Sequence, residues 1–219
     1  ARRDGDDATA LYEIDPEGGE ARRLFAHDES IGDYVWGPQG ETLYFVAREA
    51  QPEDAFEDRG FTAYAYEEDI PFAQVWRVSF EGDDAGEASS FDLEGHASDI
   101  EISDDGDHLA VALAPTPLID DRYMARRWHV VDAGDGEVVS TIESEGKTGA
   151  VAFSPDGDQL ALILGIDEND PTAGTLAVAD VRSGDFEFID VEAGQKIEDM
   201  VWLDDDSLLT LAHVSTESA

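Results

Sequence analysis

The sequence predicts an all-β protein that consists of about four repeats of one four-stranded antiparallel sheet. A hairpin of two apolar strands joined by a tight turn occurs four times along the chain. A second pattern, in which a strand enters a glycine-rich turn and a short strand follows, falls between the hairpins. The apolar residues alternate along these segments as they do in strands, and no helical period of 3.6 residues competes with this alternation.

The hairpin pattern is clearest in the stretch FSPDGDQLALIL. Pro155 presets φ for a turn, Asp156 can hydrogen-bond locally and Gly157 tolerates a positive φ, so the backbone reverses between two strands. The four copies are WGPQGETLYFVA from Trp36, ISDDGDHLAVAL from Ile102, FSPDGDQLALIL from Phe153 and WLDDDSLLTLAH from Trp202. The last copy has three aspartates in place of the Pro-Asp-Gly turn.

The second pattern supplies the remaining two strands of each repeat. Its copies are ALYEIDPEGGE from Ala10, QVWRVSFEGDDAGE from Gln74, RWHVVDAGDGE from Arg127 and TLAVADVRSGD from Thr175. Each copy is followed by a short strand-like segment: ARRLF, ASSFDL, VVSTI or FEFIDV. One repeat therefore contains a hairpin, a third strand, a turn and a fourth strand, with a period of about 50 residues.

Four-stranded sheets that repeat radially form a β-propeller, in which each sheet, or blade, buries its faces against its neighbours. We therefore expect the apolar residues around the tight turns to pack between blades. Residues 1–219 are predicted to be a single β-propeller segment. An insertion at residues 48–73 separates the second and third strands of one blade, and the blades are led by Trp36, Ile102, Phe153 and Trp202.

The sequence opens with the third and fourth strands of one unit and closes with the first two strands of another. These halves could pair into one closing blade, which would give a complete four-bladed ring. Alternatively, the chain could be an arc of a larger propeller. We favour the arc, because residues 1–3 read like the tail of a second strand and propellers of this repeat type usually have more blades.

The repeat resembles the WD-like Pro-Asp repeats of TolB-type proteins and of the prolyl oligopeptidase family of serine peptidases. The pattern W-S-P-D-G-x-x-I-A-F, then I-Y-V-x-D-x-x-G-G-E-x-x-x-L, is matched by residues 10–47 and 153–185. Within that family, residues 61–78, with YEED, Phe72 and the segment VWRV, resemble acylaminoacyl-peptidase-like members. Dipeptidyl peptidases are further relatives of this kind.

The resemblance implies a serine peptidase whose propeller caps a C-terminal α/β-hydrolase domain of the same chain and admits only short peptide substrates. The 219 residues contain no G-x-S-x-G nucleophile elbow and no alternation of helices and strands to carry one. No Ser-His-Asp set is nominated and no catalytic residue is expected, because the histidines fall in different blades or turns. They are His27, His96, His108, His129 and His213.

Glu67 and Glu68 in the insertion are the candidate substrate-binding residues. In dipeptidyl-peptidase relatives a glutamate pair binds the free amino terminus of the substrate, and two carboxylates facing an ammonium supply that chemistry. Here the pair follows the second strand of a blade, which is a different setting from the helical pair of the relatives. An ordinary solvated or ion-paired role, with Arg59 or Arg77 as partner, is the alternative.

The formal charge of −40, from 13 basic and 53 acidic residues, is typical of a protein from the salt-saturated cytoplasm of a halophile. At about 1 M salt the screening length falls to roughly 3 Å, so repulsion between carboxylates is largely quenched. Nucleic acid is not expected as a partner, because no basic stripe is present to displace phosphate counterions. A membrane partner is not expected either, since no run of about 18 apolar residues occurs.

The sequence excludes thiol chemistry and predicts no metal or cofactor. Cysteine is absent, so disulfides and Cys-based zinc sites cannot form. The acidic stretches at 104–107, 156–158 and 167–170 lack the spacing of a calcium loop, and turn chemistry explains them better. The glycine-rich turns lie between strands, with no following helix to direct N–H groups at a phosphate.

Two functions remain for this segment. The first is the non-catalytic propeller of a prolyl-oligopeptidase-type peptidase, which gates the access of short peptides to a separate hydrolase domain. The second is a stand-alone TolB-like propeller that binds a protein partner and performs no chemistry. The repeats alone do not separate these functions, since both use the same scaffold.

Overall fold

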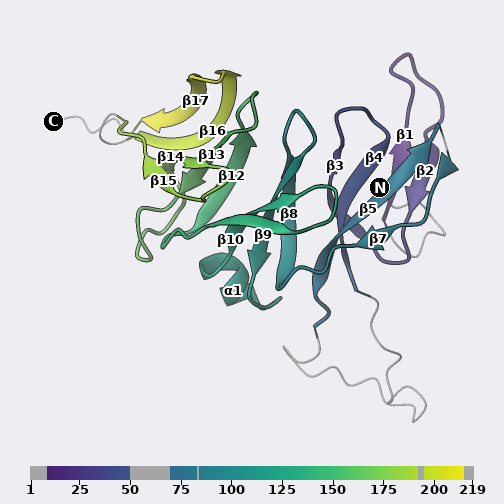
Figure 1. The fold of residues 1–219 in the computed structure, drawn as a ribbon, viewed down its shortest axis with the longest axis horizontal. Coiled ribbons are helices and arrows are strands. Elements are labelled where there is room, and N and C mark those ends of the chain that lie inside the picture. The colour runs from purple at the N-terminus through teal and green to yellow at the C-terminus, as the bar shows by residue number, and fades with distance from the viewer. Residues whose placement is uncertain (1–8, 50–69, 83, 192–194, 215–219) are drawn as a thin grey trace, which may run out of the picture.

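The computed structural model of the chain describes residues 9–49, 70–82, 84–191 and 195–214. Antiparallel sheets follow one another along the chain and stand side by side (Figure 1). The row begins with a two-stranded sheet of β1 (Ala10–Glu13) and β2 (Arg22–Ala26). It ends with a two-stranded sheet of β16 (Gln195–Asp204) and β17 (Ser207–Val214).

Three complete blades lie between these partial sheets. The first contains β3 (Ile31–Trp36), β4 (Thr42–Arg48), β5 (Ala73–Glu81) and the two-residue strands β6 (Asp84–Ala85) and β7 (Ser89–Ser90), which both pair with β5. The second contains β8 (His96–Ile102), β9 (His108–Ala114), β10 (Arg127–Asp132) and β11 (Val138–Ile142). The third contains β12 (Thr148–Phe153), β13 (Gln159–Leu164), β14 (Thr175–Asp180) and β15 (Phe186–Phe188).

The predicted order of hairpin, third strand, turn and fourth strand is confirmed in each complete blade. Trp36, Ile102 and Phe153 end the first strands of the three blades, and Trp202 holds the corresponding place near the end of β16. The glycine of the tight turn has a positive φ at Gly157, which is 75°. The turn chemistry that was expected from the sequence is therefore present.

The core lies between blades, because the central strands are buried on both faces. Along β9, Leu109 and Val111 face the first blade, whereas Ala110 and Ala112 face the third. This two-residue alternation gives each blade one surface for each neighbour. The lead residues of the blades fill the same seams, and each packs, partly buried, against a different apolar cluster. These residues are Trp36, Ile102, Phe153 and Trp202.

The first strands of successive blades contact one another, and each pairs irregularly with its second strand. In β3 the irregularity falls between Ile31 and Tyr34, and in β8 between Ala97 and Ile100. The carboxylate of Asp33 accepts a hydrogen bond of 3.0 Å from the backbone N–H of Ile100 in the next blade. Such bulges bend a strand locally and leave backbone groups for other partners.

The two partial sheets lie at opposite ends of the row and do not pair with each other (Figure 1). The described residues therefore form an open arc of blades, as favoured from the sequence, and not a closed four-bladed ring. The view that residues 1–219 are a single propeller segment stays a prediction, since most of the insertion at 48–73 lies outside the described residues.

The sequence did not predict α1 (Ile119–Met124), the one helix in the described part of the chain. It lies in the connection between β9 and β10, with Asp120 and Asp121 in its first turn and Arg122 in its last. These charges suit the helix dipole, but six residues are too few to show a helical period. This helix is also far too short to cross a membrane.

Candidate functional site

The alternation of strand directions places the connections of each blade on two opposite faces of the arc. The turns between first and second strands, and between third and fourth strands, share one face, which we call the turn face. The connections from second to third strand, and from each blade to the next, share the other, which we call the loop face. The loop face carries α1, on the lower side of the row of sheets in Figure 1. Longer connections give this face more side chains that can meet across blades.

A hollow of about 500 Å³ opens on the loop face between the second and third complete blades. Its lining comes from the α1 segment, from the start of β12 and from the connection between β13 and β14. We call it the basic pocket, and its lining residues are Ile119, Arg122, Tyr123, Arg126, Lys147, Thr148, Pro171, Thr172 and Ala173.

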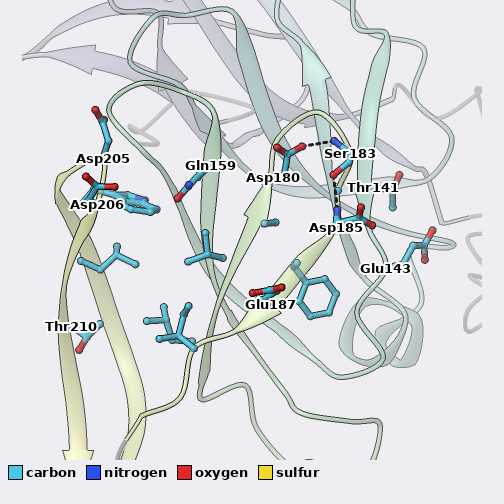
Figure 2. A pocket seen from close by; sticks show the side chains of 18 residues that line it. Thr141, Glu143, Gln159, Asp180, Ser183, Asp185, Glu187, Asp205, Asp206 and Thr210 are labelled. Atoms are coloured by element: carbon cyan, nitrogen blue, oxygen red, sulfur yellow. Dashed lines mark hydrogen bonds between the residues drawn. The ribbon is translucent and has the colours of Figure 1, made fainter.

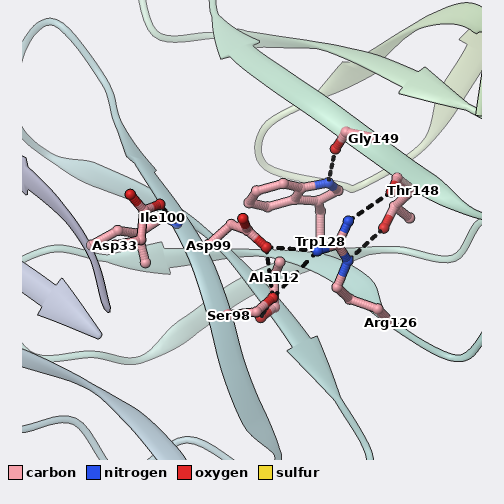
Figure 3. A network of polar contacts seen from close by, with 9 residues as sticks. All are labelled: Asp33, Ser98, Asp99, Ile100, Ala112, Arg126, Trp128, Thr148 and Gly149. Atoms are coloured by element: carbon pink, nitrogen blue, oxygen red, sulfur yellow. Dashed lines mark hydrogen bonds and ion pairs between the residues drawn. The ribbon is translucent and has the colours of Figure 1, made fainter. Parts of the chain in front are cut away.

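Arg126 joins the two blades that border the basic pocket (Figure 3). Its Nη1 lies 2.6 Å from a carboxylate oxygen of Asp99 in β8. Its Nε and Nη2 donate to the hydroxyl and the carbonyl of Thr148 in β12, at 3.1 and 2.7 Å. The indole N–H of Trp128 crosses the same seam to the carbonyl of Gly149, at 3.1 Å. These bonds fix the start of β12 against the second blade. All three guanidinium nitrogens of Arg126 therefore already have partners within the protein.

Lys147 presents a positive charge that no carboxylate neutralises in the described residues. Its Nζ donates to the backbone carbonyls of Asp170 and Pro171, at 3.2 and 2.8 Å. It also lies 5.8 Å from the centre of the Tyr123 ring, within the range of a cation–π interaction. Carbonyls and an aromatic face hold the ammonium in place but leave its full charge in the pocket.

Arg122 adds a second cation that has no ion pair with any described residue. It is exposed on α1. Three of the 13 basic residues of a chain with 53 acidic ones thus line one small hollow, and of these three only Arg126 is paired with a described carboxylate, that of Asp99. The basic pocket has a charge opposite to that of the molecule as a whole, so an anionic group is attracted to it.

The rim of the basic pocket is apolar on the side of α1. Ile119 and Tyr123 leave 66% and 67% of their surface exposed, although both have large hydrophobic side chains. None of the residues of α1 is buried. These side chains give a ligand in the basic pocket an apolar surface to cover.

His96 lies at the start of β8, at the loop face of the second blade, and is only 6% exposed. Its Nδ1 accepts a hydrogen bond of 3.0 Å from the backbone N–H of Ala73, which begins β5. Burial, and then the positive charges of Arg122 and Arg48, lower the pKa of His96 to about 4. A neutral His96 therefore anchors the strand that follows the insertion.

A larger hollow, of about 1230 Å³, lies between β14–β15 and β16–β17 (Figure 2). Its floor is apolar and its polar lining contains carboxylates without lysine or arginine. Two of these carboxylates accept backbone hydrogen bonds: Asp180 from the N–H groups of Arg182 and Ser183 in its own turn, and Asp205 from that of Asp156 in the neighbouring blade. This hollow is therefore acidic, like most of the molecule, and its described lining offers an anionic ligand no cation.

Of the residues proposed from the sequence for substrate binding or pairing, Arg77 alone lies in the described part of the chain. Glu67 and Glu68, and the possible partner Arg59, lie outside the described residues. Among the described residues, Arg77, the other possible partner, donates to the carbonyl of Gly134 and lies 5.8 Å from the centre of the Phe91 ring. No described group of carboxylates or histidines has the arrangement of a metal site.

Sequence reasoning missed the basic pocket. Neither Arg126 nor Lys147 was predicted from the sequence to have a role. The available signal was the long connection between β9 and β10, PTPLIDDRYMAR, which holds two arginines and several apolar residues at a place where a short loop suffices. The approach of Lys147 to this connection depends on how two blades pack, which no local pattern encodes.

Comparison with known proteins identifies the fold. The chain is similar to a TolB protein from Agrobacterium tumefaciens, with TM-score 0.51 and 14% identity over 82% of this chain and 55% of that one. It is also similar to the periplasmic gluconolactonase of Pseudomonas aeruginosa, with TM-score 0.56 and 15% identity over 95% and 64% of the two chains. For the WD40 repeats of RRP9 the TM-score is 0.52, with 15% identity over 86% and 47%.

These similarities establish a β-propeller of the TolB and WD40 kind, as the repeats predicted. At such identities they show the fold alone. The chain spans about half to two thirds of the length of these propellers. No family model matches the sequence, and no curated protein matches it either.

Proposed function

We propose that the chain is a non-catalytic binding propeller that holds a short peptide segment on its loop face, at the basic pocket. The observation that supports this proposal is the hollow of about 500 Å³ with two cations that lack carboxylate partners among the described residues, beside exposed Ile119 and Tyr123. The propeller neighbours support an interaction module of this type.

Binding can be tested with the 219-residue chain and short N-acetylated peptides by calorimetry at about 1 M KCl, where long-range electrostatics are screened. Tyr123→Ala is expected to weaken binding of a peptide that ends in Leu at least several-fold, because it removes an exposed aromatic contact. The matched control is Val138→Ser, which removes an exposed apolar residue from an outer strand. Equal binding by both variants would contradict the proposal.

The parent protein, in this proposal, is a prolyl-oligopeptidase-type serine peptidase of a salt-rich cytoplasm. The propeller restricts entry to short peptides, and an α/β-hydrolase domain of the same chain performs the cleavage. The gene sequence downstream tests this part: about 250 further residues with a G-x-S-x-G turn support it. A stop codon soon after the last blade favours the second candidate, a stand-alone TolB-like binder. The similarity to TolB supports this candidate.

The segment is expected to have no hydrolytic activity of its own, because it lacks a nucleophile elbow. Incubation of the purified chain with an aminoacyl-nitroanilide should release nitroaniline at the rate of the buffer. Release above that rate, in proportion to protein concentration, would contradict a non-catalytic role.

A further inference from the structure

We propose that the basic pocket binds the C-terminal carboxylate of a peptide whose last residue is apolar, with Lys147 and Arg122 as the cations that receive it. This inference rests on the proposed function, since it names the chemical group that the peptide-binding site recognises. In this inference the two residues bind the peptide, which is a different role from the restriction of peptide entry by the propeller.

The two cations are free to take an anion because their present contacts do not neutralise them. Lys147 donates to two backbone carbonyls, which leaves one of its three N–H groups for a ligand. Arg122 has no ion pair among the described residues, so its guanidinium fork is available to both oxygens of a carboxylate. The charge of the two groups is compensated when one carboxylate enters.

The position of Lys147 is held from two sides. Arg126 binds the hydroxyl and the carbonyl of the adjacent Thr148, and the carbonyls of Asp170 and Pro171 receive the ammonium itself. A cation that is fixed before binding loses less conformational freedom when the ligand arrives. Arg126 is thus a positioning residue in this site.

The apolar rim favours a chain terminus over an acidic side chain. Ile119, Tyr123 and Ala173 line the same hollow as the two cations, so the ligand must offer a carboxylate and an apolar group within a short distance. A C-terminal Leu or Phe carries both groups on one Cα. An internal Asp or Glu offers only the carboxylate and leaves the apolar rim uncovered.

The test uses calorimetry with the 219-residue chain and three peptides: acetyl-Gly-Ala-Leu with a free carboxylate, its C-terminal amide, and acetyl-Glu-Ala-Leu amide. The free acid is expected to bind about tenfold more tightly than either amide, because one charge-assisted hydrogen bond is worth roughly that factor. Tight binding of the amide with the internal Glu would show that a side-chain carboxylate is the ligand, and would overturn the inference.

Arg122→Gln is the first variant, since the side chain of Arg122 forms no ion pair that the substitution could break among the described residues. It is expected to reduce the preference for the acid over the amide to about threefold or less, as is Lys147→Gln. The matched control is Arg182→Gln, which removes one charge on the turn face, where the side chain is 82% exposed. It should keep the full preference.

The outcomes separate the two proposals. If acid and amide bind equally well and Tyr123→Ala weakens both, the peptide site stands and the carboxylate inference is overturned. If none of the three peptides binds, the proposed function fails as well. If Arg182→Gln reduces the preference as much as Arg122→Gln does, the effect is one of net charge and the assignment of the two cations is refuted.

Discussion

Single side chains that join neighbouring segments hold the arc in register, and His96 is the clearest case. Its ring is 6% exposed and accepts the N–H of Ala73, which only the unprotonated Nδ1 can do. The folded state therefore excludes a proton that the unfolded chain takes up below its ordinary pKa of 6.5.

Acidification should expose this coupling. The folded pKa of about 4 lies below the unfolded value, so the unfolded state binds more protons between the two, and stability falls as the pH drops from 6.5 toward 4. His96→Asn keeps an acceptor and cannot be protonated. Urea midpoints of the two proteins at pH 7.5 and 5.5 should therefore diverge, with the wild type losing more; parallel losses would rule out His96 as the titrating group.

Ser154 shows how one hydroxyl completes a tight turn. It is fully buried, accepts the N–H of Gln159 at 2.9 Å and donates to the carboxylate of Asp156 at 2.7 Å. Ser103 and Asp105 form the same pair one blade earlier, at 2.6 Å. In both turns the serine hydroxyl lowers the pKa of the aspartate.

Ser154→Ala is expected to cost about 1–2 kcal/mol in the free energy of unfolding, because it removes the partner of a backbone N–H. It should also raise the pKa of Asp156, since the hydroxyl is the main cause of its lowering. Denaturant unfolding and NMR titration measure these effects. Ser183→Ala, in an exposed turn, is the control and should cost less; equal costs would show that burial of the hydroxyl is irrelevant.

At the level of strands and turns, packing between blades decides which turn residues can change. Gly184 and Gly40 both have a positive φ, of 75° and 71°. A Cβ at Gly184 would lie 2.4 Å from the carbonyl oxygen of Thr141 in the preceding blade, whereas a Cβ at Gly40 would meet nothing within 4 Å. At Gly40 glycine is therefore required only by the backbone conformation. At Gly184 it is required also by the close contact with the preceding blade.

Alanine substitution at these two glycines separates the two requirements. Gly40→Ala should cost about 1–2 kcal/mol, the strain of an L-residue in the left-handed region. Gly184→Ala should cost clearly more, because the turn must also move away from the second blade. Thermal or denaturant unfolding gives both values. A similar loss of unfolding free energy in the two variants would mean that the contact between Gly184 and the second blade can relax at little cost.

The sequence located most strands but not the pocket between them. The hairpin around residues 153–164 is encoded by local turn chemistry and two-residue alternation, and β12 and β13 fall where these predict. β7 is shorter than the predicted segment ASSFDL: Ser89 and Ser90 pair with β5, and after them the N–H of Phe91 donates to the carbonyl of Val75. α1 was missed because six residues in a loop carry no period.

The molecule as a whole combines largely apolar seams, crossed by a few polar contacts, with a strongly acidic surface. With a net charge of −40, the compact state is opposed by repulsion between carboxylates, and four seams between thin sheets must overcome it. Salt weakens this repulsion without affecting the apolar contacts in the same way.

Removal of salt is therefore expected to unfold the chain. At about 10 mM salt the screening length is roughly 30 Å, so carboxylates on different blades also repel one another. Circular dichroism from about 1 M to 10 mM KCl should show a cooperative loss of the β signal. A titration with sucrose in place of salt is the control, and a β signal retained in full at the lowest salt would contradict the expectation.

From the sequence alone follow the repeat, its phase, the strand order within a blade and the acidic surface, because alternation, turn residues and charge are properties of short segments. Only the tertiary structure decided that the partial sheets remain apart, that His96 is buried against Ala73, and that Arg122 and Lys147 share one pocket. These features join residues from different blades or connections, and their meeting is set by how sheets pack across a seam.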